Sequence, residues 1–356
     1  MELPLSIGPD IDPTAIEARL WTQILNKYRE PSHLRGFAEL AVTALPLAGL
    51  WALAWLAYAH GYWWAALLIA TLAAGFMLRL FIIQHDCGHG SFFPHKRLND
   101  WVGRVLGIFT LTPYDFWRRT HAIHHATSGN LDRRGTGDID TFTVREYLAL
   151  SRFGRLKYRL YRNPVVLFVI GPTFHFAVKH RLPFGLMRNG WEPWISTMAT
   201  NVGIAIFATG AVWLMGLKGF LIVHAPVVMG AASIGVWLFF VQHQFESTAW
   251  SDGQNWNLHE TALHGSSHYD LPGPLRWFTG NIGIHHVHHL HSRIPFYRLP
   301  QVIRDYPQLG EVGRLTLLES LRCARLVLWD EDRQRLVTFK DAVQPDRPPA
   351  ASAGKS

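Results

Sequence analysis

The chain has little cysteine and little charge. Only 2 of its 356 residues are cysteine and 17% are charged, against roughly 25% charged residues in ordinary soluble domains. The two cysteines, Cys87 and Cys323, are too few for a disulfide framework. No unit repeats at a fixed period, which argues against solenoid and propeller architectures. The first 35 residues have no apolar core of the kind found in secretory signal peptides, so we expect no signal peptide there.

Apolar residues are abundant instead. They make up 49% of the sequence, which also contains 15 tryptophans. A hydrocarbon core of about 30 Å takes roughly 20 apolar residues to cross as a helix. Four stretches reach that length, and their near lack of charge favours membrane spans over the buried helices of a large soluble enzyme. The predicted spans are Leu40–Ala59, Gly61–Ile83, Ile195–Leu217 and Gly219–Gln242.

Eight histidines fall into three tight groups beside these apolar stretches. Residues three and four apart share one face of a helix, so the imidazoles of each group can point in one direction. Histidines at such spacings are often ordinary surface or core residues, but three groups in one sequence favour a metal site. Eight nitrogen ligands exceed the four to six that one first-row ion usually takes, which predicts two metals. The groups are His85 and His89; His121, His124 and His125; and His285, His288 and His289.

The three motifs, His-Asp-Cys-Gly-His, His-Ala-Ile-His-His and His-His-Val-His-His, resemble the three histidine boxes of the membrane fatty acid desaturase and hydroxylase superfamily. The resemblance extends from about residue 36 to residue 305, and the residues following the first and third boxes look most like the acyl-lipid omega-6 (delta-12) and omega-3 desaturases. It implies an oxygen-dependent enzyme with two histidine-bound iron ions that introduces a cis double bond into a fatty acyl chain, expected to be lipid-linked. His243, in Val241–Phe245, resembles the position of an additional histidine ligand in related desaturases.

The departures from the family pattern bear on substrate and partners. Three residues separate the histidines of the first box, which favours an acyl-lipid over an acyl-CoA substrate. The third box begins with His285 where front-end desaturases have glutamine, and no His-Pro-Gly-Gly haem motif is present. The resemblance therefore implies a separate electron carrier, ferredoxin or cytochrome b5.

Other polar residues near the boxes are candidates for orienting the ligating histidines. A carboxylate that accepts a hydrogen bond from the outer nitrogen of a ligating imidazole fixes its tautomer. The candidates for this role are Asp86, Asp138, Asp140, Asp270 and Asn130, with an ordinary polar loop as the alternative. Cys87 is expected to be a small neighbour of the site, not a ligand. The remaining histidines near the boxes are out of phase, wrongly spaced or too distant to be ligands: His224, His259, His264, His268, His286 and His291.

The predicted fold is an all-α integral membrane protein. Its four transmembrane helices form two hairpins, with short turns at His60 and Lys218 that carry almost no positive charge. The positive-inside rule then places both termini and all three boxes in the cytoplasm, as expected for a bacterial inner-membrane protein. A cytosolic helical cap would carry the histidine-rich di-metal site. The expected divisions are an arm at 1–35, the membrane domain at 36–305, a cap at 306–343 and a disordered tail at 344–356.

Three further segments complete the expected fold. The apolar segments 101–111 and 165–178 are too short to span and are expected at the membrane interface. Residues 152–162 alternate basic and apolar side chains, as in an amphipathic helix on an anionic surface. Residues 315–328 have helical apolar spacing and are predicted to pack as part of the cap.

Three classes of protein share some of these features: a desaturase, a hydroxylase on the same metal core and a metal transporter. A C–H bond in the middle of an acyl tail has no acidic proton and no leaving group, so a metal centre that activates oxygen is required. A hydroxylase on the same core remains the alternative to a desaturase. A metal transporter would place its ligands near the bilayer midplane, unlike these boxes. The net charge of +8 fits contact with membrane lipids, and without a recognition module no nucleic-acid partner is expected.

Overall fold

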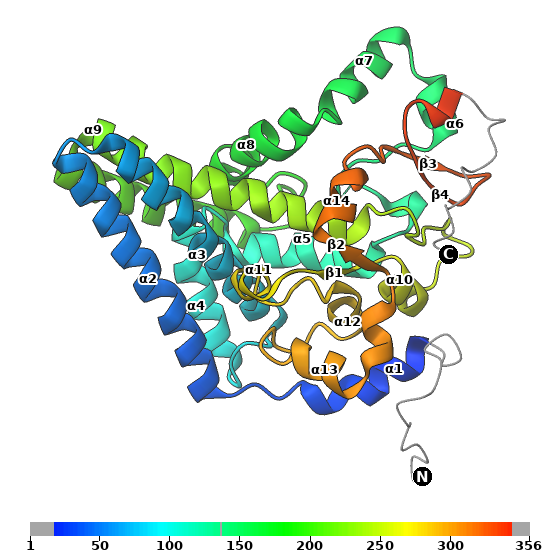
Figure 1. The fold of residues 1–356 in the computed structure, drawn as a ribbon, viewed down its shortest axis with the longest axis horizontal. Coiled ribbons are helices and arrows are strands. Elements are labelled where there is room, and N and C mark those ends of the chain that lie inside the picture. Colours follow the sequence, from blue (N-terminus) through cyan, green and yellow to red (C-terminus); the bar gives the residue numbers. More distant parts are fainter. Residues whose placement is uncertain (1–17, 136, 344–356) are drawn as a thin grey trace, which may run out of the picture.

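The computed structural model describes residues 18–135 and 137–343, so the tail predicted from residue 344 lies outside it. Three helices are long and apolar enough to cross a membrane: α2 (His33–Ala59), α3 (Trp63–His89) and α9 (Glu192–His243). They pack together at one end of the molecule, and the short helices and strands gather at the other end (Figure 1). Helix α3 runs beyond the predicted end at Ile83 and through the first histidine group. It stops at Gly90, which adopts the left-handed conformation of a helix C-cap.

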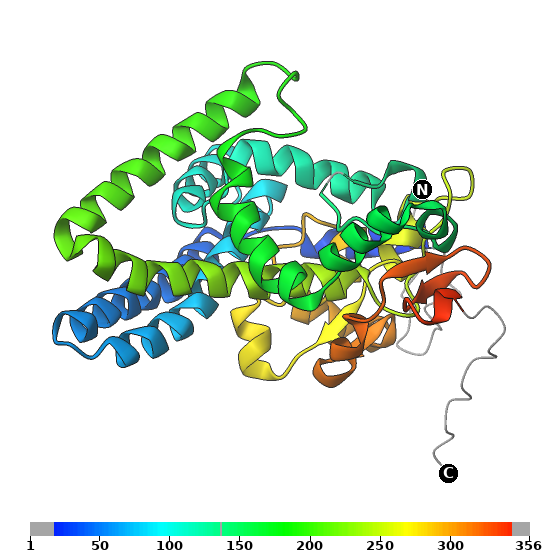
Figure 2. The ribbon, with the colours of Figure 1, turned by 90° about the horizontal axis from the view of Figure 1, so that it is seen from above.

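Helix α9 contains both predicted spans of the second hairpin. Its 52 residues are interrupted at Gly216, where φ is 72° and ψ is 156°. This region of backbone space is open essentially to glycine alone. The two arms of α9, green and yellow-green, meet at the left end of Figure 2, where the chain doubles back. Phe207 of the first arm contacts Phe220 and His224 of the second, so the arms pack near the break. The turn thus lies two residues before the predicted position, Lys218.

The shorter segments form separate elements. The segment 101–111 lies largely in α4, and 165–178 forms a π-helix, Val166–Ile170, followed by α8. The basic amphipathic segment is helix α7, which extends away from the bundle at the top of Figure 1. The remaining α-helices are α1 (Ala18–Leu25), α4 (Lys96–Phe109), α5 (Tyr114–Thr127), α6 (Val144–Ala149), α7 (Arg152–Tyr161), α8 (Gly171–Ala177), α10 (Leu258–His264), α11 (Gly273–Phe278), α12 (His285–Leu290), α13 (Leu299–Asp305) and α14 (Leu317–Cys323).

The fold is mostly helical but not all-α. Strands β1 (His268–Asp270) and β2 (Arg314–Thr316) pair in parallel, and β3 (Leu328–Asp330) and β4 (Arg335–Val337) pair antiparallel. The predicted helix at 315–328 is therefore wrong at both ends. Thr316 and Glu319 form a capping box that starts α14 only after β2, and the helix ends at Cys323. Apolar spacing could not reveal β2, because its partner lies more than 40 residues away.

A buried ion pair joins the first two long helices. Arg79 of α3 is 1% exposed and contacts Glu39 of α2, and its Nε donates to Thr43 Oγ1 at 3.2 Å. The guanidinium also lies over the ring of Trp277 in α11, 4.1 Å from its centroid. Because an unpaired charge is costly in such surroundings, these contacts fix α2 and α11 against α3.

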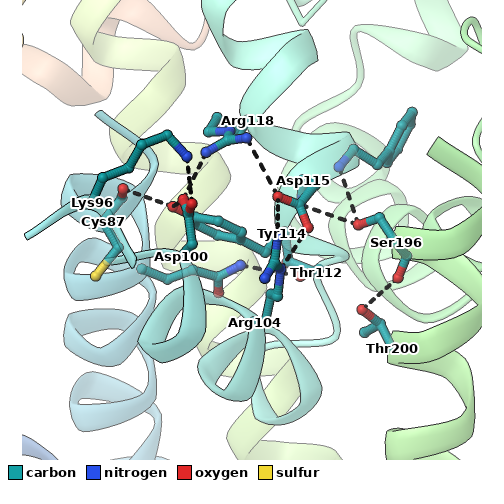
Figure 3. A network of polar contacts seen from close by, with 12 residues as sticks. Cys87, Lys96, Asp100, Arg104, Thr112, Tyr114, Asp115, Arg118, Ser196 and Thr200 are labelled. Carbon is teal, nitrogen blue, oxygen red and sulfur yellow. Dashed lines mark hydrogen bonds and ion pairs between the residues drawn. The ribbon is translucent and has the colours of Figure 1, made fainter. Parts of the chain in front are cut away.

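A second polar network holds α5 in place (Figure 3). The Tyr114 hydroxyl donates to the carbonyl of Cys87 at 2.7 Å and to Asp100 at 3.3 Å. The backbone N–H groups of Asp115 and Phe116 donate to Ser196 Oγ in α9. The network thus fixes the start of α5 against α3, α4 and α9, which sets the position of the second histidine group.

Candidate metal centre

Four helices bring nine histidines together. His85 and His89 come from the end of α3, and His243 is the last residue of α9. Helix α5 contributes His121, His124 and His125, and helix α12 contributes His285, His288 and His289. All nine sequence-predicted ligand positions therefore meet in one region of the molecule.

The nine imidazoles form two separate clusters. Within each cluster, one nitrogen from every ring lies within 4.8 Å of the corresponding nitrogens of the others, an arrangement that could hold a metal ion. Adjacent histidines point to different clusters because successive helix residues are about 100° apart around the axis. The first cluster contains His85, His89, His121, His125 and His288, and the second contains His124, His243, His285 and His289.

The spacing of the Nε2 atoms fits metal ligation. In the first cluster they follow one another at 3.0–3.2 Å in the order His85, His89, His121, His125 and His288. In the second they do so at 3.0–3.2 Å in the order His124, His243, His285 and His289. Two nitrogens at right angles on one ion, each about 2.1 Å from it, are about 3.0 Å apart, whereas tetrahedral ligands would be about 3.4 Å apart. The distances between neighbouring nitrogens are compatible with ligation of one ion by each cluster.

The protonation state of the rings also favours metal binding. Burial, and then the neighbouring histidines, hold the pKa of His121, His125, His285, His288 and His289 well below the ordinary value, so these rings are neutral. A neutral ring carries one proton and cannot donate from Nε2 to two neighbours. Converging lone pairs without protons repel each other, and a cation between them removes the repulsion.

Two carboxylates hold the outer nitrogens of ligand candidates. His124 Nδ1 lies 2.5 Å from Asp138 Oδ1, and His85 Nδ1 lies 3.1 Å from Asp86 Oδ1. With the proton directed to the carboxylate, Nε2 is left free to face the cluster. The other oxygen of Asp86 accepts the N–H of Phe296 at 2.6 Å, which ties the segment after the third box to α3.

The other candidate partners lie elsewhere. The N–H of Asp140 donates to the Tyr161 hydroxyl, Asp270 pairs with Arg276 and Arg314, and the side chain of Asn130 accepts from the N–H of Asp132. None of these three contacts a cluster histidine within the described residues.

The remaining histidines also lie outside the two clusters. His286 and His268 contact the carbonyls of Leu309 and Gly310, and His291 contacts Asn26. His259 lies near Thr22, His264 near Glu260, and His224 stacks on Phe220 inside α9. The Cys87 thiol is buried and belongs to neither cluster.

Four residues that contact the site were not predicted. Trp117 stacks on His121 with ring centroids 4.5 Å apart, and Phe239 packs against His124 and His243. Each aromatic residue precedes a histidine by four positions, so the helical spacing could have identified both. His243 Nδ1 lies 3.4 Å from both Ser128 Oγ and the Gly265 carbonyl, and the loop that brings Gly265 there leaves no local signal in the sequence.

The nine histidines are not equally buried. The rings of His85, His124, His243, His285 and His288 are buried, whereas His89, His121, His125 and His289 are partly exposed. A small cavity of about 30 Å³ adjoins the second cluster, and its lining includes His243, Asp138 and Arg134. The cavity has room for about one water molecule.

Comparisons with known proteins agree with this geometry. The family model described as fatty acid desaturase matches residues 62–316. A fatty acid desaturase of Bacillus subtilis is 42% identical over 319 residues, covering 90% of each protein. An sn-1 acyl-lipid omega-3 desaturase (ferredoxin) of Synechocystis sp. is 31% identical over 80% of this chain and 79% of its own. An sn-1 oleoyl-lipid 12-desaturase of the same organism is 27% identical over 66% of this chain and 67% of its own. From the matched family model and the extent of these similarities, the chain belongs to the fatty acid desaturase family of membrane-bound enzymes.

Proposed function

We propose that the protein introduces a cis double bond into the acyl chain of a membrane lipid, using O2 and two iron ions held by the nine histidines. The observation that carries this proposal is the pair of clusters, in which Nε2 atoms follow one another at 3.0–3.2 Å. The choice of iron rests on the family, because imidazole also suits zinc, copper and nickel. When bound, the two ions would supply the oxygen chemistry that removes hydrogen from an unactivated C–H bond.

The two clusters would differ in the number of protein ligands. The first offers five imidazoles and the second four. Each ion would be held by its own set of imidazoles, and together the two ions would supply the oxygen chemistry. Asp138 and Asp86 would orient His124 and His85, and Trp117 would hold the ring of His121 by stacking.

The names of the relatives support the substrate and donor classes. Two of them are described as sn-1 acyl-lipid omega-3 desaturases (ferredoxin). We infer an acyl-lipid substrate and a ferredoxin-type donor. Removing two hydrogens from the acyl tail while reducing O2 to two waters requires two electrons and two protons, so the carrier would deliver two electrons per turnover.

We also propose a membrane topology of four spans, with α2, α3 and the two arms of α9 crossing. The arm at 1–35 and the cap at 306–343 would then flank a membrane domain at 36–305 on the cytoplasmic side of an inner membrane. The clusters support this, because they lie at the last residues of α3 and α9, away from the turns at His60 and Gly216.

The topology can be tested by labelling thiols. Both native cysteines are buried, and residues 60 and 325 are exposed. In intact cells a membrane-impermeant thiol reagent should label His60→Cys and leave Arg325→Cys unlabelled until the cells are opened. Labelling of Arg325→Cys in intact cells would contradict the orientation.

The activity is tested by expression in a bacterium that makes only saturated and monounsaturated fatty acids, together with a ferredoxin and its reductase. Mass spectrometry with double-bond localisation should reveal a new diene, whose bond positions give the regiochemistry. A hydroxylated product would establish the alternative reaction on the same core. An unchanged profile, from a protein shown to be folded and to hold two irons with this donor, would contradict the proposal.

A further inference from the structure

Helix α7 carries two stripes of side chains that the metal centre does not use. Arg152, Arg155 and Arg159 follow the i, i+3, i+7 spacing of one helix face, and Phe153, Leu156 and Leu160 follow the same spacing one residue later. The apolar stripe faces outward, with Phe153 69% and Leu160 55% exposed. The helix therefore presents positive charge and bare apolar surface side by side.

The arginines line a groove between α6 and α7, which we call the α7 groove. It has a volume of about 240 Å³ and is lined by Tyr147, Leu148, Arg152, Arg155, Leu156 and Arg159. Among the ion pairs of the described residues none involves these arginines, and the nearby acids Glu331 and Asp332 pair with Arg145 instead. The groove thus holds positive charge that no carboxylate of residues 18–135 and 137–343 neutralises.

Two of the arginines are held in fixed orientations. Arg155 donates from Nε to the Leu150 carbonyl at 3.0 Å and from Nη2 to the Leu148 carbonyl at 3.4 Å. Arg159 donates from Nε to the Tyr147 hydroxyl at 2.7 Å, and its guanidinium lies over the ring of Phe339. Among the contacts of residues 18–135 and 137–343, these bonds leave Nη1 of Arg155 and both Nη atoms of Arg159 without a hydrogen-bond partner. Because the guanidinium groups are ordered in advance, less entropy is lost on binding.

We propose that the α7 groove binds the phosphate of an anionic phospholipid, while Phe153, Leu156 and Leu160 enter the acyl region beside it. Arginine is the residue best suited to phosphate oxygens, because its planar N–H groups can donate in pairs. The apolar surface continues from α7 along the neighbouring elements, where Val165, Ile170 and Phe174 are also exposed. A soluble acidic partner would leave this apolar surface unexplained, and a lipid accounts for both stripes.

The test uses the full-length protein in detergent. Native mass spectrometry would measure the affinity for phosphatidylglycerol and for phosphatidylcholine, with R155Q/R159Q, R152Q and the control R325Q, an exposed arginine outside the groove. We expect tighter binding of phosphatidylglycerol by the unaltered protein and by R325Q, with a loss of roughly fivefold for each groove arginine removed. Arg152 has no hydrogen bond or ion pair among the described contacts, so R152Q tests the charge even if R155Q/R159Q misfolds.

Four outcomes would overturn the proposal. One is equal affinity for the two lipids, and another is an unchanged preference for phosphatidylglycerol in R152Q and R155Q/R159Q. In the third, inorganic phosphate alone would stabilise the protein against heat as much as phosphatidylglycerol does, which would make the groove a free-anion site. Loss of turnover with reduced ferredoxin in R152Q, with lipid binding intact, would assign the groove to the electron donor instead.

Discussion

At the scale of single residues, the end of a helix separates a ligand candidate from a neighbour of the same type, because α12 ends at Leu290 and His291 is its non-helical C-cap. His288 contributes to the first cluster, whereas His291, three residues on, contacts Asn26 outside it. We expect His288→Ala to abolish product formation and to lower bound iron while leaving membrane insertion intact. His291→Ala should retain most of both. Iron content of the purified variants, measured beside fatty acid profiles, checks this, and full inactivation by His291→Ala would mean that the wrong ring was chosen.

Asp138 gives a second test at this scale. Its carboxylate lies 2.5 Å from His124 Nδ1, and Asp140, two residues on, contacts no cluster histidine among the described residues. Loss of such an orienting carboxylate typically costs about 10–100-fold in metal affinity. Asp138→Asn should therefore lose iron to a chelator at concentrations that Asp140→Asn withstands. If the two variants lost iron alike, the 2.5 Å contact would have no orienting role.

Some of these residues could be predicted from the sequence and others could not. Local spacing identified the histidines of the boxes, and the family resemblance added His243. The expectation that each box points its rings in one direction holds for the first box only, because the second and third boxes divide their rings between the two clusters. The acidic partners were ambiguous, because Asp86 and Asp138 meet histidines while Asp140 and Asp270 lie in similar loops and do not. Which of these carboxylates reaches a ring depends on loop paths between distant elements, and no local pattern encodes them.

At the scale of elements, the break in α9 depends on one glycine. Gly216 combines a φ of 72° with a ψ of 156°, and an added Cβ would meet nothing within 4 Å. Any penalty for Gly216→Ala therefore comes from the backbone alone, about 1–3 kcal/mol. Gly210 has equally open surroundings but an ordinary helical backbone, so Gly210→Ala should be neutral or stabilise by about 1 kcal/mol. In thermal unfolding experiments in detergent, the unfolding temperatures of the Gly216→Ala and Gly210→Ala variants should shift in opposite directions or by clearly different amounts. Equal shifts in the unfolding temperature would argue against a backbone constraint at Gly216.

Helices and strands could be predicted where their signal is local in the sequence, but not where they depend on contacts between distant residues. Apolar length alone located α2, α3 and both arms of α9, since about 20 residues are needed whatever the packing. The position of the turn depended on the backbone angles of Gly216, and the prediction placed it at Lys218. The strands β1 and β2 were missed because their pairing joins residues 268–270 to residues 314–316, and three-residue strands have too short a pattern to detect.

At the scale of the whole molecule, the nine histidines join α12 to α3, α5 and α9, with which α12 otherwise shares few contacts. The first cluster joins α3, α5 and α12, and the second joins α5, α9 and α12. A bound ion stabilises only the folded arrangement, and saturation at 100 times the dissociation constant contributes about 2.7 kcal/mol for each site. Removal of the metals should thus lower the unfolding temperature of the whole protein and not merely of the cap.

Chelation tests this coupling directly. Treatment with a chelator should lower the unfolding temperature, and Fe²⁺ should restore it, whereas Mg²⁺ should not because it prefers oxygen ligands to imidazole. His288→Ala, with the first cluster reduced to four imidazoles, should show a smaller shift on chelation than the unaltered protein, because less binding free energy remains to be lost. An unfolding temperature unaffected by chelation in both proteins would mean that the helices hold the imidazoles in place without metal. In that case the repulsion between their neutral Nε2 atoms would be offset by packing such as the stacking of Trp117 on His121.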